Sequence, residues 1–495
     1  MSTLDAPIIV ASNRGPVTFE RDDSGELSPR RGSGGLVTAL VGALQASHGL
    51  WVAAAMSEGD REVVARDGRG LVDMEAYGWP YRVRYLDIPP DTYDAYYNHV
   101  SNGILWFVHH YLWDTVRSPS FDDDTVRAWD EYVEVNRTFA QALAEEGDQQ
   151  RSQPVFLIQD YHLSLVPRFL RELRPDALIA HFSHTSFAGA TYMRTLPGTI
   201  REGIIRGLLG ADVLGFHSQA WAENFMMSAR PLQGVRADLA RSRILVEGRE
   251  VLVRIHPISI DVGPMREASG SSEVRELRKQ LNRWRGNTRL VVRVDRFELT
   301  KNIARGFRAF GLFLRRHPEW QERVRFLALL SPSRTEVPEY RAYAEECIAE
   351  ADAVNREFGH QGWEPIEVRV KDDHAGAIAA YGLYDVLLVN PIYDGMNLVA
   401  MEGPVLNRRH GVLVLSRNAG AYWRLGRYAL PVNPFDLGEM ADGIATALDM
   451  PADERARRAR GLSRLVLSNP PQRWVGAQLD DLERVRRRRF VVHVS

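Results

Sequence analysis

The chain has 495 residues, of which 45% are apolar and 25% charged, and its formal net charge is −2. This length exceeds what one ordinary core holds and predicts two domains of α/β size. The nearly neutral charge argues against a nucleic-acid-binding protein, and the single cysteine, Cys347, excludes a disulfide framework or a thiolate metal cluster.

The N-terminal stretch, residues 1–14, has neither a basic segment nor a long apolar run, so it does not resemble a signal peptide. No window approaches eighteen uninterrupted apolar residues, the length needed to span a bilayer. We therefore expect a cytoplasmic protein that does not insert into membranes.

Short apolar runs alternate with long amphipathic stretches throughout the chain, which is typical of parallel sheets covered by helices. In the first half we expect a helix over 163–173 and strands over 8–11, 154–158, 177–183 and 211–217. These strands are apolar on both faces, as central parallel strands are.

A second α/β series is expected after residues 254–260. It predicts a helix over 302–317 and strands over 289–294, 324–330, 366–370, 386–390 and 411–416. Four arginines at 486–489 are expected on the solvated face of a last helix. We predict two doubly wound domains, 1–258 and 259–475, and a C-terminal helix over 476–495.

Ligands of such sheets bind beyond the carboxyl ends of the strands, and the loops there carry the basic residues Arg14, Arg296, Lys301 and Arg334. Arg296 and Lys301 stand between a strand and a helix, whose N-terminus also favours anions. Such a pair alone is more often surface decoration. Its position favours phosphate binding.

Two glycine-rich segments also follow strands or precede helices: residues 31–36 (RGSGGL) and 394–398 (DGMNL). Neither is a Walker loop or a G-x-G-x-x-G fingerprint. The second segment would bind a diphosphate through its amides, while Asp394 and Glu402 accept hydrogen bonds from sugar hydroxyls. The alternative for DGMN is a plain turn with an aspartate cap.

Asp160, His162 and His184 follow two neighbouring predicted strands. Metal-ligand spacings and a G-x-S-x-G nucleophile elbow are both missing from the sequence. Phosphate-binding loops and sugar-facing carboxylates without a nucleophile indicate group transfer from a nucleotide sugar.

Collinear motifs over roughly Ile8 to Asp481 resemble one family, the trehalose-6-phosphate synthases, which are retaining glycosyltransferases of the GT-B fold with two Rossmann-like domains facing a central cleft. The motifs are SNRGP, GSGGL, YYNHVSNGILW, WDEYVEVNRTFA, QDYHL, RVDRFELTKN, PSRTEVPEY, YDGMNLVAMEG and GVLVLSRNAGA.

The resemblance implies that the C-terminal helix over 476–495 packs back on the first domain. It also implies roles for matching positions. It assigns acceptor binding to Arg14, Tyr97, Trp106, Asp160 and Arg334. It assigns catalysis to Arg296, Lys301, Asp160, His184 and Asp394, with His184 on the 6-hydroxyl of the donor sugar. The implied donor-binding residues are Gly34, Gly35, Arg296, Lys301, Asp372, Gly395, Met396, Asn397, Leu398, Val399 and Glu402.

The family mechanism implies transfer of glucose from a nucleoside-diphosphate glucose to glucose 6-phosphate with retention. The leaving phosphate accepts the proton of the acceptor, so the resemblance implies neither a carboxylate nucleophile nor a metal or other cofactor. Arg296 and Lys301 would supply the positive charge.

The sequence departs from the family pattern at three places beside the sugar pockets. In the G-L-W-x-G-W motif the second tryptophan is replaced by Ala54. Residues 184–188 read HTSFA instead of H-I-P-F-P, so both prolines are missing. In the R-L-D-Y-S/T-K-G motif the aspartate is Glu298 and the glycine is Asn302. These changes put substrate identity in more doubt than reaction type.

The loop expected beside the nucleotide base reads Lys371-Asp372-Asp373-His374. Guanine offers two adjacent N–H donors that a carboxylate accepts, whereas uracil offers one. GDP-glucose is therefore a hypothesis beside UDP-glucose, with a solvated turn as the alternative for the two aspartates.

Two other functions remain open: a related transferase with another acceptor (glucosylglycerol phosphate or a cyclitol), and a non-catalytic regulatory family member. The expected partners are small-molecule substrates, with neither nucleic acid nor membrane, and homo-oligomers remain open.

Overall fold

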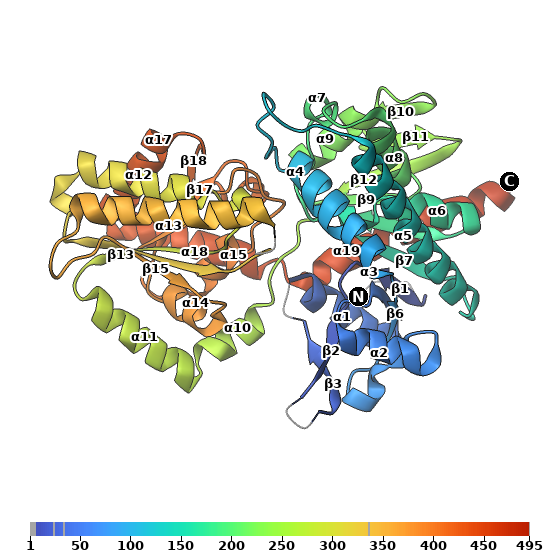
Figure 1. Cartoon of the computed structure of the whole chain (residues 1–495), viewed down its shortest axis with the longest axis horizontal. Coiled ribbons are helices and arrows are strands. Elements are labelled where there is room, and N and C mark those ends of the chain that lie inside the picture. The colour runs from blue at the N-terminus through green and yellow to red at the C-terminus, as the bar shows by residue number, and fades with distance from the viewer. Residues whose placement is uncertain (1–5, 23–24, 33–34, 335–336, 495) are drawn as a thin grey trace. The chain divides into compact units, whose positions relative to one another are not determined.

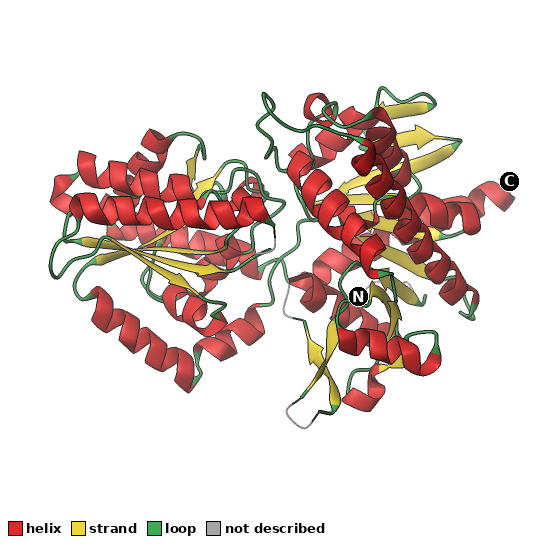
Figure 2. Ribbon diagram, in the orientation of Figure 1, coloured by secondary structure: helices red, strands yellow, loops and turns green. Residues whose placement is uncertain are grey.

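The computed structural model describes residues 6–22, 25–32, 35–334 and 337–494. The chain divides into two compact units, which are described separately. Unit 1 comprises residues 1–258 and 471–495, and unit 2 comprises residues 259–470. Each unit is a twisted sheet with helices packed on it (Figures 1 and 2).

Unit 1 is built on a ten-stranded sheet in the order β10-β11-β12-β9-β8-β7-β1-β4-β6-β5. The strands from β12 to β6 in this order pair in parallel, whereas β5, β10 and β11 pair antiparallel at the two edges. The strands are β1 (Ile8–Ala11), β4 (Leu50–Ala54), β5 (Leu71–Asp73), β6 (Arg82–Leu86), β7 (Val155–Gln159), β8 (Leu178–Phe182), β9 (Val213–Phe216), β10 (Val235–Asp238), β11 (Arg243–Val246) and β12 (Arg249–Ile255); β2 (Val17–Arg21) and β3 (Leu27–Arg31) form a separate hairpin.

Helices cover this sheet and carry their apolar faces toward it. The longest is α5 (Asp123–Asp148), which is capped by the preceding residue, Asp122, whose side chain accepts a hydrogen bond from Thr125 N. The other helices are α1 (Gly35–Ser47), α2 (Glu58–Asp67), η1 (Met74–Tyr77), α3 (Pro90–Asp94), η2 (Ala95–Leu105), α4 (Trp106–His109), η3 (Tyr161–Leu163), α6 (Val166–Leu173), α7 (Ala190–Met193), α8 (Gly198–Leu208), α9 (Gln219–Ala229) and α19 (Pro471–Val494).

Helix η2 is a π-helix of 11 residues between α3 and α4. π-Helical turns are rare and occur frequently at functional sites. The apolar side of η2 is buried through Tyr96, Val100, Ile104 and Leu105. The wider winding therefore lies in the segment that carries Tyr97 and leads into Trp106.

Helix α19 returns to unit 1 after the chain has completed unit 2, and it packs against α1, β8 and β9. Near its start the Trp474 ring is 2% exposed. Near its end Arg489 pairs with the buried Asp212, and Arg488 pairs with Glu250 at 2.5 Å. The arginine run is therefore a set of anchoring contacts in addition to a solvated face.

Unit 2 is built on a six-stranded parallel sheet in the order β15-β14-β13-β16-β17-β18. Its strands are β13 (Arg289–Arg296), β14 (Val324–Ser331), β15 (Ile366–Val370), β16 (Val386–Val389), β17 (Val412–Ser416) and β18 (Leu430–Val432).

Two helical layers enclose the unit 2 sheet (Figure 1). One contains α12 (Ile303–Arg316), α13 (Pro338–Phe358) and α17 (Leu437–Asp449), and the other contains α10 (Val262–Ser269), α11 (Ser272–Arg285), α14 (His374–Tyr381), α15 (Val399–Leu406) and α18 (Ala452–Leu467). The core of the first layer centres on Phe307, Phe310 and Phe313 against Phe326. Short helices η4 (Leu299–Lys301), η5 (Pro318–Trp320) and α16 (Tyr422–Leu425) complete the unit.

The apolar strands predicted from the sequence are all present, and β15 has the predicted bounds. The strands β2, β3, β4, β5, β6, β10, β11, β12 and β18 were not predicted. Most of them are short or polar and lack the continuous apolar run of a buried parallel strand, whereas β4 is a fully buried apolar strand that the prediction missed. Among the described residues, no helix has the length and apolar character needed to cross a membrane.

Candidate active site

Three loops with predicted site residues follow neighbouring strands of unit 1. β8, β7 and β1 are adjacent and parallel, so the loops that begin at Ser183, Asp160 and Ser12 leave the same edge of the sheet. Asp160 Oδ1 accepts hydrogen bonds from Tyr161 N at 3.0 Å and from His184 N at 3.1 Å. The structure thus brings Asp160 and His184 together.

Asp160 is held in an unusual conformation at the end of β7. Its φ of 72° lies in a region that non-glycine residues rarely adopt. The carbonyl of Asp160 accepts a hydrogen bond from His181 Nε2 at 3.0 Å, which helps to fix this backbone. Burial raises the pKa of the carboxyl to about 6, although the two backbone hydrogen bonds work in the opposite direction.

His184 is a buried, neutral imidazole. Burial, and then the nearby His217 and His181, lower its pKa well below the usual value. Its Nε2 donates to Gln159 Oε1 at 3.0 Å, which leaves Nδ1 as an acceptor. The Trp474 ring of α19 lies 5.5 Å from the imidazole. His184 can therefore accept a hydrogen bond from a sugar hydroxyl, and its ring is held on two sides.

A row of stacked rings contains the two aromatic residues predicted to bind the acceptor. Tyr97 stacks on Tyr93 at 5.4 Å and on His162 at 5.7 Å between ring centroids. Trp106 lies 5.9 Å from Tyr161, whose ring also stacks on His162. Such faces suit the apolar face of a sugar ring.

Arg14 lies at the end of β1 next to this row. Asn13 Nδ2 donates to the Tyr93 hydroxyl at 3.0 Å, and Ser12 Oγ donates to the Arg14 carbonyl at 2.7 Å. The Arg14 side chain is exposed, and within residues 6–22, 25–32, 35–334 and 337–494 no carboxylate forms a salt bridge with it. An exposed guanidinium without a counter-charge suits a phosphate.

In unit 2, Arg296 and Lys301 flank the turn between β13 and α12. Lys301 Nζ lies 2.6 Å from Asp394 Oδ2, and Arg296 Nη2 lies 3.0 Å from Glu298 Oε1. Burial disfavours the charged form of Lys301, but Asp394, Glu298 and Asp295 outweigh it, so the pKa of Lys301 is raised. Lys301 is therefore charged at neutral pH, and Arg296 and Lys301 can together receive a diphosphate.

The segment from Asp394 to Val399 connects β16 to α15 as predicted from its glycine and asparagine. Asn397 has a φ of 69°, and its Nδ2 donates to Asp394 Oδ2 at 3.1 Å. A Cβ on Gly420 would lie 1.8 Å from the Gly395 carbonyl oxygen, so only glycine permits this close approach of two loops. Met396 is buried, and Leu398 and Val399 begin α15, where backbone N–H groups have no partner within the helix.

Glu402 lies one turn into α15. The Tyr381 hydroxyl donates to Glu402 Oε2 at 3.0 Å. Burial raises the pKa of Glu402, and this hydrogen bond opposes the rise. The carboxylate is thereby oriented from α14, which suits recognition of a hydroxyl group.

Arg334 also belongs to unit 2, at the end of β14. Its guanidinium hydrogen-bonds to the Tyr340 hydroxyl and lies 5.2 Å from the centre of that ring. The neighbouring Ser333 Oγ donates to Glu298 Oε1 at 3.2 Å, the same oxygen that pairs with Arg296. Glu298 therefore links the loops of the two arginines.

The other residues predicted to bind the donor lie in the loop before α14 and at the start of α1. Asp373 caps α14, because its Oδ1 accepts a hydrogen bond from Gly376 N at 2.7 Å, whereas Asp372 is exposed. Gly35 is the first residue of α1, and Gly34 lies outside the described residues.

Sequence reasoning missed four side chains that orient this machinery: Gln159, Trp474, Glu298 and Tyr381. Gln159 and Glu298 stand within recognisable motifs, but Trp474 and Tyr381 lie 290 and 21 residues from the groups they contact. Only the folded chain shows these pairs.

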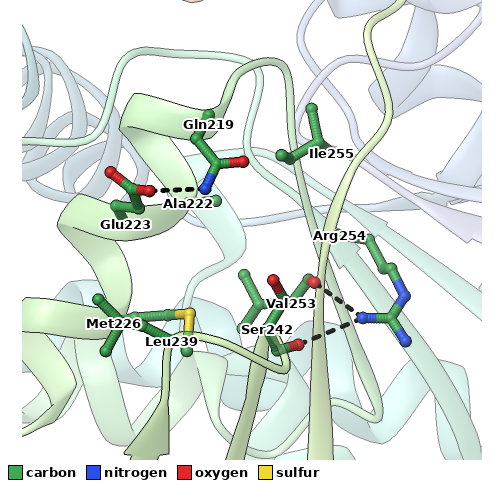
Figure 3. Close-up of a pocket in the computed structure, with 9 residues that line it drawn as sticks. All are labelled: Gln219, Ala222, Glu223, Met226, Leu239, Ser242, Val253, Arg254 and Ile255. Atoms are coloured by element: carbon green, nitrogen blue, oxygen red, sulfur yellow. Dashed lines mark hydrogen bonds between the residues drawn. The ribbon is translucent and has the colours of Figure 1, made fainter.

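A cavity of about 220 Å³ lies away from all predicted site residues, between α9 and β12 (Figure 3). Its polar groups already pair with one another: Gln219 donates to Glu223, and Arg254 donates to the carbonyl oxygens of Ser242 and Val253. In the part of the chain that the structure describes, no group of three His, Cys, Asp or Glu residues could hold a metal ion.

Comparisons with known proteins show the family to which the chain belongs. The sequence model of Glycosyltransferase family 20 matches residues 6–484. A validamine 7-phosphate valienyltransferase of Streptomyces hygroscopicus subsp. jinggangensis is 34% identical over 485 residues, which cover 96% of this chain and 94% of that protein. A trehalose-6-phosphate synthase of Mycolicibacterium smegmatis is 35% identical over 485 residues, which cover 96% and 92%.

A solved structure is similar over the same length. The UDP-forming α,α-trehalose-phosphate synthase from Burkholderia xenovorans in complex with glucose-6-phosphate has a TM-score of 0.82 and 27% identity, covering 96% of this chain and 100% of that chain. The family resemblance predicted from the motifs is confirmed: the chain belongs to Glycosyltransferase family 20 and has the GT-B fold.

Proposed function

We propose that the chain transfers a glucosyl unit from a nucleoside-diphosphate glucose to glucose 6-phosphate and forms trehalose 6-phosphate with retention. The observation that carries this proposal is the arrangement of Arg296 and Lys301 at the end of β13, where Lys301 contacts Asp394 of the loop that opens α15. Two cations, a helix N-terminus and a carboxylate together suit a sugar diphosphate.

Charge develops on the leaving diphosphate as its bond to the anomeric carbon breaks. Arg296 and Lys301 would neutralise this charge, and removal of one such group commonly costs on the order of a hundredfold in rate. The leaving phosphate would take the proton of the attacking hydroxyl. On donor binding, Lys301 would exchange Asp394 for the phosphate, and Asp394 would accept a hydrogen bond from the donor glucose.

The acceptor would be bound mainly by unit 1. Arg14 and Tyr97 would bind its phosphate, while Trp106 would pack against the sugar and Asp160 would accept hydrogen bonds from its hydroxyls. The related Burkholderia enzyme was solved in complex with glucose-6-phosphate, which supports glucose 6-phosphate as the acceptor. In unit 2, Glu402 would bind the donor.

The donor base is the least constrained part of the proposal. Asp373 is engaged as a helix cap, so a carboxylate reader of guanine would be the exposed Asp372 alone. GDP-glucose and UDP-glucose are thus the two donors to compare.

The test is a product assay with glucose 6-phosphate and UDP-, GDP- or ADP-glucose, each with and without a chelator. We expect trehalose 6-phosphate, unaffected by the chelator because Arg296 and Lys301 supply the charge of a metal. Faster turnover with GDP-glucose than with UDP-glucose, lost in Asp372→Ala, supports Asp372 as the base reader. No product with any donor refutes the proposal.

A second candidate follows from the similarity to the validamine 7-phosphate valienyltransferase, which is as high as that to the synthases. The chain would then transfer a valienyl group to validamine 7-phosphate. A competition assay with both acceptors separates the two functions, because a valienyltransferase would consume validamine 7-phosphate and leave glucose 6-phosphate unused.

A further inference from the structure

We propose that Arg293 is a positioning residue that fixes Lys301 and the start of the donor-binding loop, and thereby sets the affinity for the donor diphosphate. The proposal rests on the function above for the role of Lys301, and it adds a residue that begins the RVDRFELTKN motif but to which the resemblance assigns no role. Arg293 lies on β13, three residues before Arg296.

Arg293 is fully buried, with 0% of its surface exposed, and its guanidinium makes four contacts. Nε donates to Asp295 Oδ2 at 2.8 Å, Nη1 to the Ile303 carbonyl at 3.3 Å, and Nη2 to the Lys301 carbonyl at 2.8 Å and to Asn390 Oδ1 at 2.5 Å. The guanidinium therefore forms hydrogen bonds with the backbone carbonyls on both sides of Asn302.

The same guanidinium reaches the other half of the donor site through Asn390, which follows β16 four residues before Asp394. Asn390 Nδ2 donates to the Asn302 carbonyl at 3.2 Å, and Asn302 Nδ2 donates to the Asn390 carbonyl at 3.0 Å and to the Pro434 carbonyl at 2.7 Å. Arg293 thus ties the segments that carry Lys301 and Asp394 to one buried centre.

The fold provides space and charge for this centre. A Cβ on Gly306 would lie 2.4 Å from Arg293 Nη1, so glycine in α12 makes room for the guanidinium. Burial raises the pKa of Asp295, while Arg293 and then Lys301 oppose the rise. Without Arg293 the loop backbone would lose the hydrogen bonds to the carbonyls of Lys301 and Ile303. The Lys301 side chain would then be attracted by Asp295 and Asp394 with its backbone no longer fixed.

Asn302 gives a second reason to expect positioning. Its φ of 59° lies in the left-handed region, and the residue ends η4 and begins α12. A sharp turn of this kind aims the preceding Lys301 side chain, and its geometry depends on the carbonyls that Arg293 holds. A displacement of about 1 Å in a substrate-binding group can cost on the order of a hundredfold in rate.

The chain offers a direct probe of Lys301, because it contains only three lysines: Lys279, Lys301 and Lys371. The Lys301 side chain is 15% exposed, whereas that of Lys279 is 72% exposed and Lys371 is also exposed. Labelling with an amine-reactive reagent, followed by mass spectrometry of the peptides, reports the protection of Lys301 against two internal references.

The variants are Arg293→Met, Arg293→Lys and the matched control Arg455→Met. Arg455 is also buried in unit 2, at 8% exposure. Its guanidinium also donates to a carboxylate, that of Asp385, and to two backbone carbonyls, those of His410 and Arg409. Arg293→Lys keeps the charge beside Asp295 and loses the fork, and it serves as the test variant if Arg293→Met does not fold.

In Arg293→Met we expect Lys301 labelling to rise by roughly tenfold relative to Lys279, and the donor KM and the Kd for UDP and GDP to rise by roughly tenfold to a hundredfold. The KM for glucose 6-phosphate should stay within about twofold, since Arg293 touches no acceptor group, and Arg293→Lys should be intermediate. Folded Arg455→Met should keep wild-type labelling and donor KM.

Unchanged Lys301 labelling and unchanged donor binding in the folded Arg293 variants would overturn the proposal. Equal changes in Arg455→Met would also overturn it, because they would reflect general destabilisation. The labelling needs no turnover, so it decides the role of Arg293 even if the wild-type chain forms no trehalose 6-phosphate, an outcome that refutes the proposed function alone.

Discussion

At the scale of single residues, Asp160 combines a strained backbone with a buried carboxyl. Its φ of 72° is maintained by the hydrogen bond from His181, and its Oδ1 accepts both local N–H groups. The arrangement leaves Oδ2 to accept from a ligand. The pKa of the Asp160 carboxyl is consequently raised to about 6, because burial disfavours the charged form.

Asp160→Asn should therefore change how the free energy of unfolding depends on pH. The folded pKa exceeds the unfolded value of about 3.8, so the folded state binds more protons between these values and the free energy of unfolding falls as pH rises from about 4 to 6. Asparagine keeps the Oδ1 contacts and removes this loss, which amounts to about 3 kcal/mol above pH 7.

Urea unfolding at pH 4 and pH 7.5 checks this expectation. Asp160→Asn should gain stability over wild type at pH 7.5 relative to pH 4, and should lose most of its activity. Asp176→Asn, at an exposed carboxylate of the same unit, is the control. An equal free energy difference between Asp160→Asn and wild type at both pH values would contradict the assignment.

At the scale of elements, α19 is part of unit 1 although it is last in sequence. Asp481 of this helix bonds His256 Nε2 at 2.8 Å and Arg254 Nε at 3.4 Å, and Trp474 packs edge-on against Phe182 of β8. The helix thus supports the strand that leads to His184.

Trp474→Ala should destabilise unit 1 by about 3–5 kcal/mol, since a buried indole leaves a large cavity. It should also raise the donor KM, because the His184 ring loses one of its supports. Trp423→Ala is the control, since Trp423 is 57% exposed and its loss should cost less than about 0.5 kcal/mol. Thermal unfolding and kinetics of both variants provide the measurement, and equal stability of the two would refute the role of Trp474.

At the scale of the whole molecule, the two units differ in continuity. Unit 2 is one uninterrupted segment with its own core, whereas unit 1 needs residues 471–495 to cover β8 and α1. A domain with its own core can fold alone.

A fragment of residues 259–470 should therefore unfold cooperatively and bind UDP or GDP with affinity within about tenfold of the full chain. A fragment of residues 1–258 should be unstable until a peptide of residues 471–495 is added. Circular dichroism on heating and calorimetric titration measure both effects. A stable fragment 1–258 without the peptide would show that α19 is dispensable.

Much of the fold could be predicted because buried parallel strands such as 289–294 and 324–330 are short apolar runs between amphipathic helices. The π-helix η2 could not, since its residues also fit an ordinary helix and only its packing selects the wider winding. Likewise the sequence of the Asp372-Asp373 loop is equally compatible with base recognition and with the helix cap that Asp373 forms.

The sequence by itself determined the α/β class, the family and the residue types of the candidate site, because periodicity and motif chemistry are local properties of the chain. Only the tertiary structure decided which partners contact those residues and hold them in position. Lys301 meets Asp394 across 93 positions, Arg293 meets Asn390 across 97, and Trp474 lies beside His184. Such contacts depend on strand order and helix packing, which bring together residues whose separation in sequence carries no signal of their proximity.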